Sequence, residues 1–161
     1  MKHCLAACIA VAALSMISTS AAAQTVRMTA TLSGGEETPA PGVATGASGT
    51  AAITIDVPNQ EMTVTLTVFN LPSPTSAAHI HVSPRGLSGP VVIDFPLPTG
   101  RTGDLTISFR AGRSSFRPRP EIGIGTIEDA IQAMLTGNAY VNVHTVANGA
   151  GEIRGQLTVS Q

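Results

Sequence analysis

The stretch from Thr50 to Phe69, TAAITIDVPNQEMTVTLTVF, alternates apolar and polar residues in two segments on either side of Pro58-Asn59-Gln60. Side chains at every second position of an extended strand point to the same face. The turn residues between the two segments reverse the chain. The pattern predicts two antiparallel strands whose core faces carry Ala51, Ile53, Ile55 and Val57, and then Met62, Val64, Leu66 and Val68.

Similar alternation recurs along the rest of the chain. It predicts strands over 24–32, in the histidine-bearing segment 76–86, over 88–95 and over 104–110, and two more around an Asn148-Gly149 turn within 140–157. The chain has no Trp and one Tyr, so the core must be mostly aliphatic.

One segment has the signals of a helix near 127–136. Thr126 can cap the helix, Glu128 and Asp129 favour its first turn, and Gly137 can end it. Its predicted buried face carries Ile127, Ile131, Met134 and Leu135. Together these elements predict an all-β fold, a Greek-key antiparallel β-sandwich or barrel of about seven to eight strands with one short helix.

Residues 1–23 have a short basic start, an apolar run and a small-residue ending, which is the pattern of a signal peptide cleaved after Ala23. We therefore expect residues 24–161 to form a single domain that is periplasmic or secreted. Both cysteines, Cys4 and Cys8, precede the predicted cleavage point.

The mature chain would carry eight arginines against ten acidic residues, a net charge of −2, which does not favour nucleic-acid binding. No later segment is long and apolar enough to predict a membrane span, and the sequence specifies neither a protein partner nor an oligomeric state.

Three of the four histidines occupy polar faces of predicted strands. His79 and His81 point away from the aliphatic face of Ala78 and Ile80, and His144 lies on a strand of the last hairpin. Neutral imidazoles bind copper or zinc, so His79, His81 and His144 are a candidate metal site if their strands are neighbours. The structural alternative is that these histidines only brace strands and loops through hydrogen bonds.

The last hairpin gathers further polar residues on the face that carries His144. Matching apolar residues across the hairpin places His144 opposite Glu152 or Arg154, and Glu152 is a candidate to orient its imidazole. The favoured interpretation of the set is a structural hydrogen-bond network of Tyr140, Asn142, Glu152, Arg154 and Gln156.

The motifs Ala78-His-Ile-His81, Gly89-Pro-Val-Val92, Gly137-Asn-Ala-Tyr-Val-Asn-Val-His-Thr145 and Gly151-Glu-Ile-Arg-Gly-Gln156 resemble those of the CHRD domain family over residues 26–159. The resemblance implies a secreted module with no settled biochemical activity. Two departures are the segment after His81, which reads Val-Ser-Pro-Arg-Gly where the family commonly has a glycine-rich continuation, and a longer and more basic segment between Arg110 and Thr126.

A weaker likeness is to Cu/Zn superoxide dismutase, a Greek-key barrel whose copper site uses a His-x-His strand and a further histidine. His79, His81 and His144 resemble those ligands, no histidine matches the bridging ligand or the zinc site, and copper is therefore favoured over zinc. By the same analogy Arg154 would steer an anion.

The leading hypothesis is a non-enzymatic module that binds copper or another transition metal, with copper favoured. The alternatives are a structural or adhesive module without metal, and a redox enzyme similar to superoxide dismutase. Thiol and Gly-x-Ser-x-Gly hydrolase chemistry are disfavoured, because the mature chain has neither cysteine nor that motif.

Overall fold

The computed structural model describes residues 24–160, and the predicted signal peptide with its cleavage point lies outside them. Nine strands account for most of the domain: β1 Thr25–Ser33, β2 Ser48–Asp56, β3 Glu61–Leu71, β4 Thr75–Val82, β5 Val91–Asp94, β6 Gly103–Ala111, β7 Ala139–Thr145, β8 Ile153–Gln156 and β9 Thr158–Val159. The helical elements are α1 Ile127–Leu135 and three short 3-10 turns, η1 Gly34–Glu36, η2 Arg113–Ser115 and η3 Pro120–Ile122. No helix among residues 24–160 is both long and apolar enough to cross a membrane.

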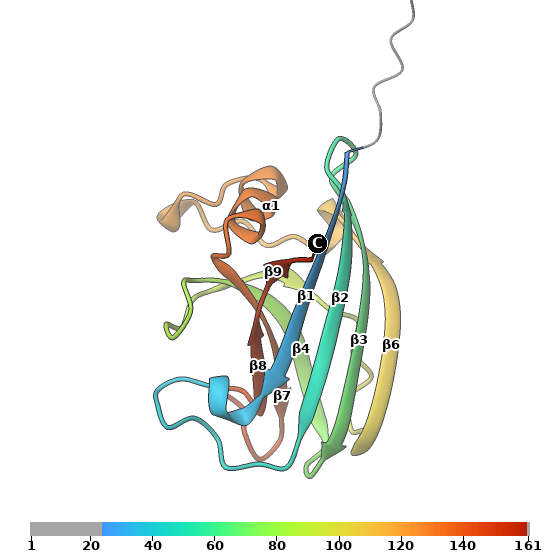
Figure 1. Cartoon of the computed structure of the whole chain (residues 1–161), viewed down its shortest axis with the longest axis vertical. Coiled ribbons are helices and arrows are strands. Elements are labelled where there is room, and N and C mark those ends of the chain that lie inside the picture. Colours follow the sequence, from blue (N-terminus) through green and yellow to red (C-terminus); the bar gives the residue numbers. More distant parts are fainter. Residues whose placement is uncertain (1–23, 161) are drawn as a thin grey trace, which may run out of the picture.

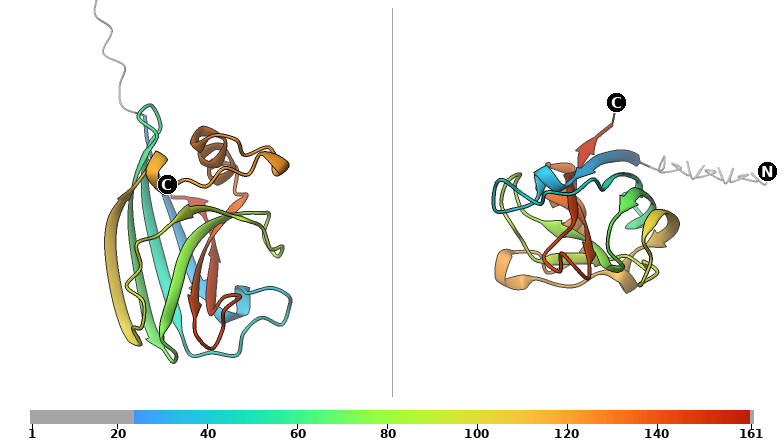
Figure 2. Two further views of the ribbon diagram at one scale, coloured as in Figure 1. Left: turned by 180° about the vertical axis from the view of Figure 1, so that it is seen from behind. Right: turned by 90° about the horizontal axis from the view of Figure 1, so that it is seen from below.

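The strands form one antiparallel sheet in the order β5-β4-β7-β8-β1-β2-β3-β6, which curls into a nearly closed barrel, while β9 pairs with β1 (Figures 1 and 2). Three pairs of neighbouring strands are not consecutive in the chain: β4 with β7, β8 with β1, and β3 with β6. The sheet therefore contains crossover connections between strands that are not adjacent in sequence. The predicted all-β, antiparallel fold with one short helix is confirmed.

The seam between the edge strands β5 and β6 is closed by the segment that follows β6. Phe116 forms an antiparallel bridge with Ile93, and the Arg117 N–H donates to the Val92 carbonyl. Inside the seam the rings of Phe95 and Phe109 pack edge to face, with centroids 4.9 Å apart. The segment after β6 therefore acts as an irregular extra strand beside β5.

The core contains the side chains that the alternation predicts. Met28, Leu32, Ile53, Val64 and Ile80 are all at most 1% exposed. The hairpin β2–β3 has the predicted pairing, for example Ile53 opposite Val64 and Ala51 opposite Leu66. The strand predicted over 88–95 is shorter, because Pro90 offers no N–H to the ladder and β5 begins only at Val91.

Helix α1 covers one end of the barrel (Figure 1). Thr126 and Asp129 form a reciprocal capping box at its start, and Gly137 takes a left-handed φ of 76° just beyond its end. Its buried face is made of Ile127, Ala130, Ile131 and Met134, whereas Leu135, predicted on that face, is only half-buried. Three of the four predicted core positions of the helix are thus confirmed.

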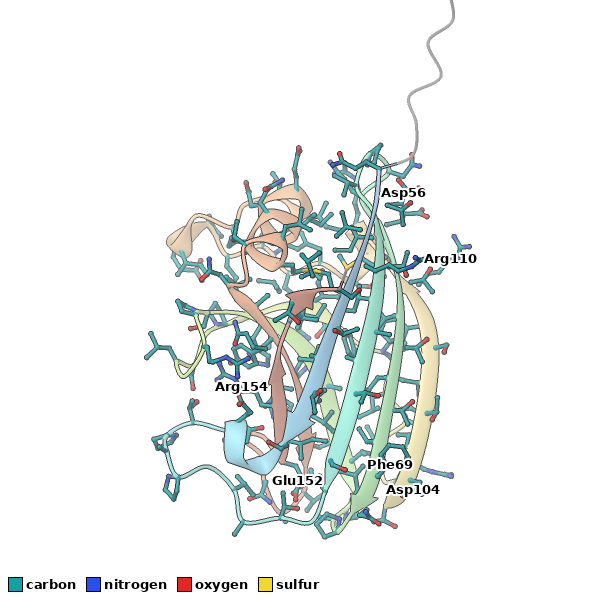
Figure 3. All side chains as sticks on the ribbon, viewed as in Figure 1. Asp56, Phe69, Asp104, Arg110, Glu152 and Arg154 are labelled. Carbon is teal, nitrogen blue, oxygen red and sulfur yellow. The ribbon has the colours of Figure 1, made fainter. Side chains whose placement is uncertain are left out.

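The outer face of β7 and β8 is covered as well as the inner one, and that of β4 is covered in part. Every residue of β7 is buried, although its outward-facing residues are polar. The loops 34–47 and 83–90 supply the cover: Glu37 accepts a hydrogen bond from the Asn142 amide, and Arg154, labelled in Figure 3, donates to the Leu87 carbonyl. A polar layer is therefore enclosed between these strands and the two loops.

Candidate metal centre

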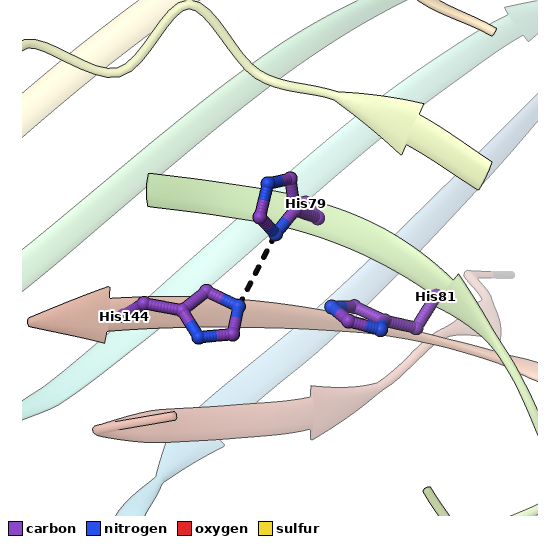
Figure 4. A group of neighbouring side chains, drawn as sticks. All are labelled: His79, His81 and His144. Atoms are coloured by element: carbon purple, nitrogen blue, oxygen red, sulfur yellow. Dashed lines mark hydrogen bonds between the residues drawn. The ribbon is translucent and has the colours of Figure 1, made fainter. Parts of the chain in front are cut away.

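His79 and His81 project from the outer face of β4, and His144 projects from β7 beside them (Figure 4). The two strands are direct neighbours, with His79 opposite Asn142 and His144 opposite Ala77. Ring centroids are separated by 5.5 Å for His79 and His81, 5.0 Å for His79 and His144, and 5.9 Å for His81 and His144. One nitrogen from each ring lies within 4.8 Å of the others, so the three rings can share one metal ion.

Backbone carbonyls fix the protonation of two of the rings. Nδ1 of His81 lies 2.9 Å from the Gly89 oxygen, and Nδ1 of His144 lies 3.0 Å from the Gly149 oxygen. A carbonyl oxygen only accepts hydrogen bonds, so each Nδ1 must carry the proton. In the neutral rings Nε2 of His81 and Nε2 of His144 are then lone-pair donors.

His79 uses its other nitrogen toward the cluster. Its Nδ1 lies 3.2 Å from Nε2 of His144, whereas its Nε2 faces Asp94, 3.6 Å from Oδ1. If these rings hold a metal, the nitrogens that face one another are Nδ1 of His79 and Nε2 of His81 and of His144.

Burial keeps these imidazoles neutral. It lowers the pKa of His79 to about 4, aided by the neighbouring His144, and it lowers the pKa of His81 to about 4 against the opposing hydrogen bond to Gly89. The pKa of His144 is also lowered by burial. At neutral pH the three imidazoles are therefore uncharged, which is the charge state that metal binding needs.

The family model for the CHRD domain matches residues 28–157, which include β4, β7, β8 and all three histidines. The chain belongs to the CHRD domain family. Neither the curated proteins nor the solved structures gave a match.

In this CHRD domain an aromatic stack links His81 to Arg154. The rings of His81 and Tyr140 are nearly parallel, with centroids 4.8 Å apart and an interplanar angle of 9°. Cζ of Arg154 lies 3.4 Å from the centroid of the same Tyr140 ring. Arg154 also donates to the Leu87 carbonyl and is only 2% exposed, which favours a part in holding the loop; that it steers an anion stays a prediction.

Glu152 is fully buried but does not orient His144 as predicted. The register, with Val143 opposite Ile153, puts Glu152 across from His144, which is one of the two positions predicted by matching apolar residues across the hairpin. Its Oε2 nevertheless accepts hydrogen bonds from Thr145 Oγ1 at 2.8 Å and from Asn148 Nδ2 at 2.6 Å. The Gly149 carbonyl orients His144 instead, while Glu152 fixes the turn of the hairpin.

The remaining members of the predicted network tie the strands to the loops. Gln156 Nε2 donates to the carbonyls of Ser83 and Gly137. Asn142 Nδ2 donates to Glu37 Oε1 at 2.6 Å. Burial raises the pKa of Glu37 to about 7, in spite of the opposing effects of Arg154 and the Asn142 hydrogen bond.

Sequence reasoning missed Glu37, Asp94 and the two carbonyl groups that hold His81 and His144. Every residue offers a carbonyl, so no residue type marks the ones that bind an imidazole. Asp94 did carry a signal, because it is the one charged residue in the Val-Val-Ile-Asp-Phe run of the predicted strand 88–95. Its pairing with His79 across β4 and β5 depends on the register, which includes a bulge between Ile80 and His81.

Proposed function

We propose that this CHRD domain is a non-enzymatic, extracytoplasmic module that binds one transition-metal ion, preferably copper, through Nδ1 of His79 and Nε2 of His81 and His144. The observation that carries the proposal is the convergence of these three nitrogens within 4.8 Å, with the outer nitrogens of two rings held by carbonyl groups. Partners of this kind on the far side of the imidazole orient and strengthen histidine ligands in metal sites.

Hydrogen bonding within the cluster supports the proposal. Nε2 of His81 is buried and has no hydrogen-bond partner among residues 24–160. One proton can join His79 Nδ1 and His144 Nε2 across their 3.2 Å contact, but it leaves the His81 nitrogen unpaired. A buried, unpaired polar atom costs about 1–3 kcal/mol, and a shared metal ion would satisfy all three nitrogens at once.

The donor set favours copper. It consists of three neutral imidazoles without a thiolate or a carboxylate, and affinity for such nitrogen sites rises along the first-row divalent metals to a maximum at Cu²⁺. Three protein ligands also leave coordination positions for water or another small ligand.

The location outside the cytoplasm rests on the signal-peptide pattern of residues 1–23 and on membership of a family implied to be secreted. Residues 24–161 would then be the mature, single-domain protein. Detection of a mature N-terminus at Gln24 in the periplasmic or secreted fraction is the expected result, and retention of the uncleaved chain in the cytoplasm would contradict it.

Isothermal titration of residues 24–161 with Cu(II) and, separately, with Zn(II) tests the metal site. We expect one copper ion to bind per chain, more tightly than zinc, and binding to be lost when His79, His81 and His144 are all replaced by Ala. Thr63→Ala, on the exposed face of β3, is the matched control and should bind like the unmodified chain. Equal, weak binding by the triple variant and the unmodified chain would overturn the proposal.

The structural or adhesive alternative is favoured by the dense hydrogen bonding of Arg154, Glu152 and Gln156 to the neighbouring loops. It predicts that a chelator leaves the melting temperature unchanged in protein purified with its natural metal content. Redox catalysis similar to superoxide dismutase is the third hypothesis. It rests only on likeness to that enzyme, and fold likeness alone does not assign activity. Superoxide consumption that depends on added copper would favour that enzyme over the non-enzymatic module.

A further inference from the structure

His79 differs from the other two histidines in the partner of its outer nitrogen. Its Nε2 faces the Asp94 carboxylate, whereas the outer nitrogens of His81 and His144 face neutral carbonyl groups. His79 and Asp94 are paired directly across β4 and β5, so their side chains emerge on the same face of the sheet.

Asp94 is itself held by Arg117, which lies in the basic segment between β6 and α1. Nε of Arg117 donates to Oδ2 of Asp94, which leaves Oδ1 directed to His79. The Arg117 backbone is anchored beside β5 by its 2.8 Å hydrogen bond to Val92 and by the adjacent bridge of Phe116 with Ile93. Arg117 thus reaches Asp94 from a fixed position.

We propose that Asp94 and Arg117 are a positioning pair for the metal site: Arg117 holds the Asp94 carboxylate against Nε2 of His79, which directs Nδ1 to the metal and favours a divalent over a monovalent ion. The inference rests on the proposed metal-binding function and names two residues that set the affinity and charge preference of that site. Neither Asp94 nor Arg117 contacts the metal in this arrangement.

Two physical effects operate in the same direction. A carboxylate beside the outer N–H increases the electron donation of an imidazole and restricts its rotation. Its negative charge also stabilises Cu(II) more than Cu(I), because the interaction scales with the charge of the ion. Both side chains are partly exposed, 36% for Asp94 and 52% for Arg117, so solvent screening reduces the charge effect.

The experiment compares Cu(II) and Cu(I) affinities, measured by chelator competition on residues 24–161, for the unmodified chain, Asp94→Asn, Arg117→Gln and the double variant. We expect Asp94→Asn to weaken Cu(II) binding about tenfold, the low end of the range for such partners, and Cu(I) binding by a smaller factor. The double variant should bind like Asp94→Asn, since Arg117 acts through Asp94.

Arg117→Gln separates positioning from simple charge. Loss of a nearby positive charge would by Coulomb's law strengthen cation binding, whereas loss of the residue that places Asp94 should weaken it. We expect weaker Cu(II) binding and an altered nitrogen hyperfine pattern in the Cu(II) EPR spectrum. Arg119→Gln is the matched control. Arg119 lies in the same segment as Arg117, but its guanidinium donates to the Val91 carbonyl of β5, so its replacement should change neither measurement.

Unchanged Cu(II) affinity in Asp94→Asn, or stronger Cu(II) binding in Arg117→Gln, would overturn the positioning pair and leave the metal site itself standing. Failure of the unmodified chain to bind copper would instead overturn the proposed function. Melting curves of the metal-free variants identify any that are misfolded, and Asp94→Glu, which keeps the charge, should recover part of the lost Cu(II) affinity.

Discussion

Two walls of the barrel, one formed by β2 and β3 and the other by β7 and β8, have the same alternation of apolar and polar residues but differ in the burial of their outer faces. On β2 and β3 the outward residues are mainly threonines such as Thr50, Thr54 and Thr63, which are exposed or half-buried. On β7 the outward residues include Asn142 and His144, which are 2% and 9% exposed because loops cover them. Figure 3 shows the contrast between Arg154, beside the covering loops, and Arg110, which projects from the opposite wall.

The difference shows where burial has a cost that must be offset. A buried polar group destabilises the fold unless it is hydrogen-bonded, so a covered polar face requires specific partners. The threonines on β2 and β3 need no such partners, because they can form hydrogen bonds with solvent. The buried polar residues on the outer face of β7 and β8 instead depend on particular hydrogen-bond partners within the protein.

The largest expected effect is from breaking the covered wall at Arg154. Replacing it with Met removes the contact with Tyr140 and the hydrogen bond to Leu87, and leaves Glu37 without its neighbouring cation. We expect the free energy of unfolding in urea to fall by roughly 3 kcal/mol. Thr63→Ala on the other wall should change it by less than about 0.5 kcal/mol, and similar losses at both sites would remove the distinction between the walls.

Copper bound at the covered wall should raise the free energy of unfolding of the protein by an amount that depends on the free copper concentration. At a free Cu(II) concentration about 100 times the dissociation constant, a site present only in the folded state adds about 2.7 kcal/mol. We expect a higher melting temperature in calorimetry for the unmodified chain. His144→Ala should abolish that increase while leaving the metal-free melting temperature within a few degrees, and an increase that persists in this variant would exclude His144 as a ligand.

Glu37 should make stability depend on pH, because its pKa is raised from 4.5 to about 7 in the fold. A raised pKa means that the folded state prefers the protonated carboxyl, so this stabilisation is complete below pH 4.5 and is lost as the pH rises through 7. Between pH 5 and 8 we expect the unmodified chain to lose roughly 1–3 kcal/mol relative to Glu37→Gln, measured by urea unfolding at each pH. Parallel pH profiles for the two proteins would contradict the raised pKa.

Sequence reasoning was most successful where a periodic pattern alone decides the structure. The hairpin β2–β3 and helix α1 follow from alternation and from the Thr126 cap, since each depends on neighbouring residues. The polar faces of His79 and His81 were likewise predictable. That β4 lies beside β7 was not, because the strands are joined through long crossing connections and residue type does not encode their pairing. The cover of loops 34–47 and 83–90 was equally hidden: nothing in the sequence marked Glu37 as buried, and Arg154 was expected in a hydrogen-bond network of the hairpin but not beneath a loop.

The smallest expected effect tests a region that belongs to neither wall. Thr126 caps α1 at the end of the barrel, where its hydroxyl accepts a hydrogen bond from the Asp129 N–H at 3.2 Å. Thr126→Ala should lower the free energy of unfolding by about 1 kcal/mol, because one amide of the first helical turn loses its partner. Copper affinity should not change, since the helix contributes none of the three histidines. If the variant weakened copper binding as well, helix and metal site would be coupled through the shared core, and the effects of the covered wall could no longer be separated from those of overall stability.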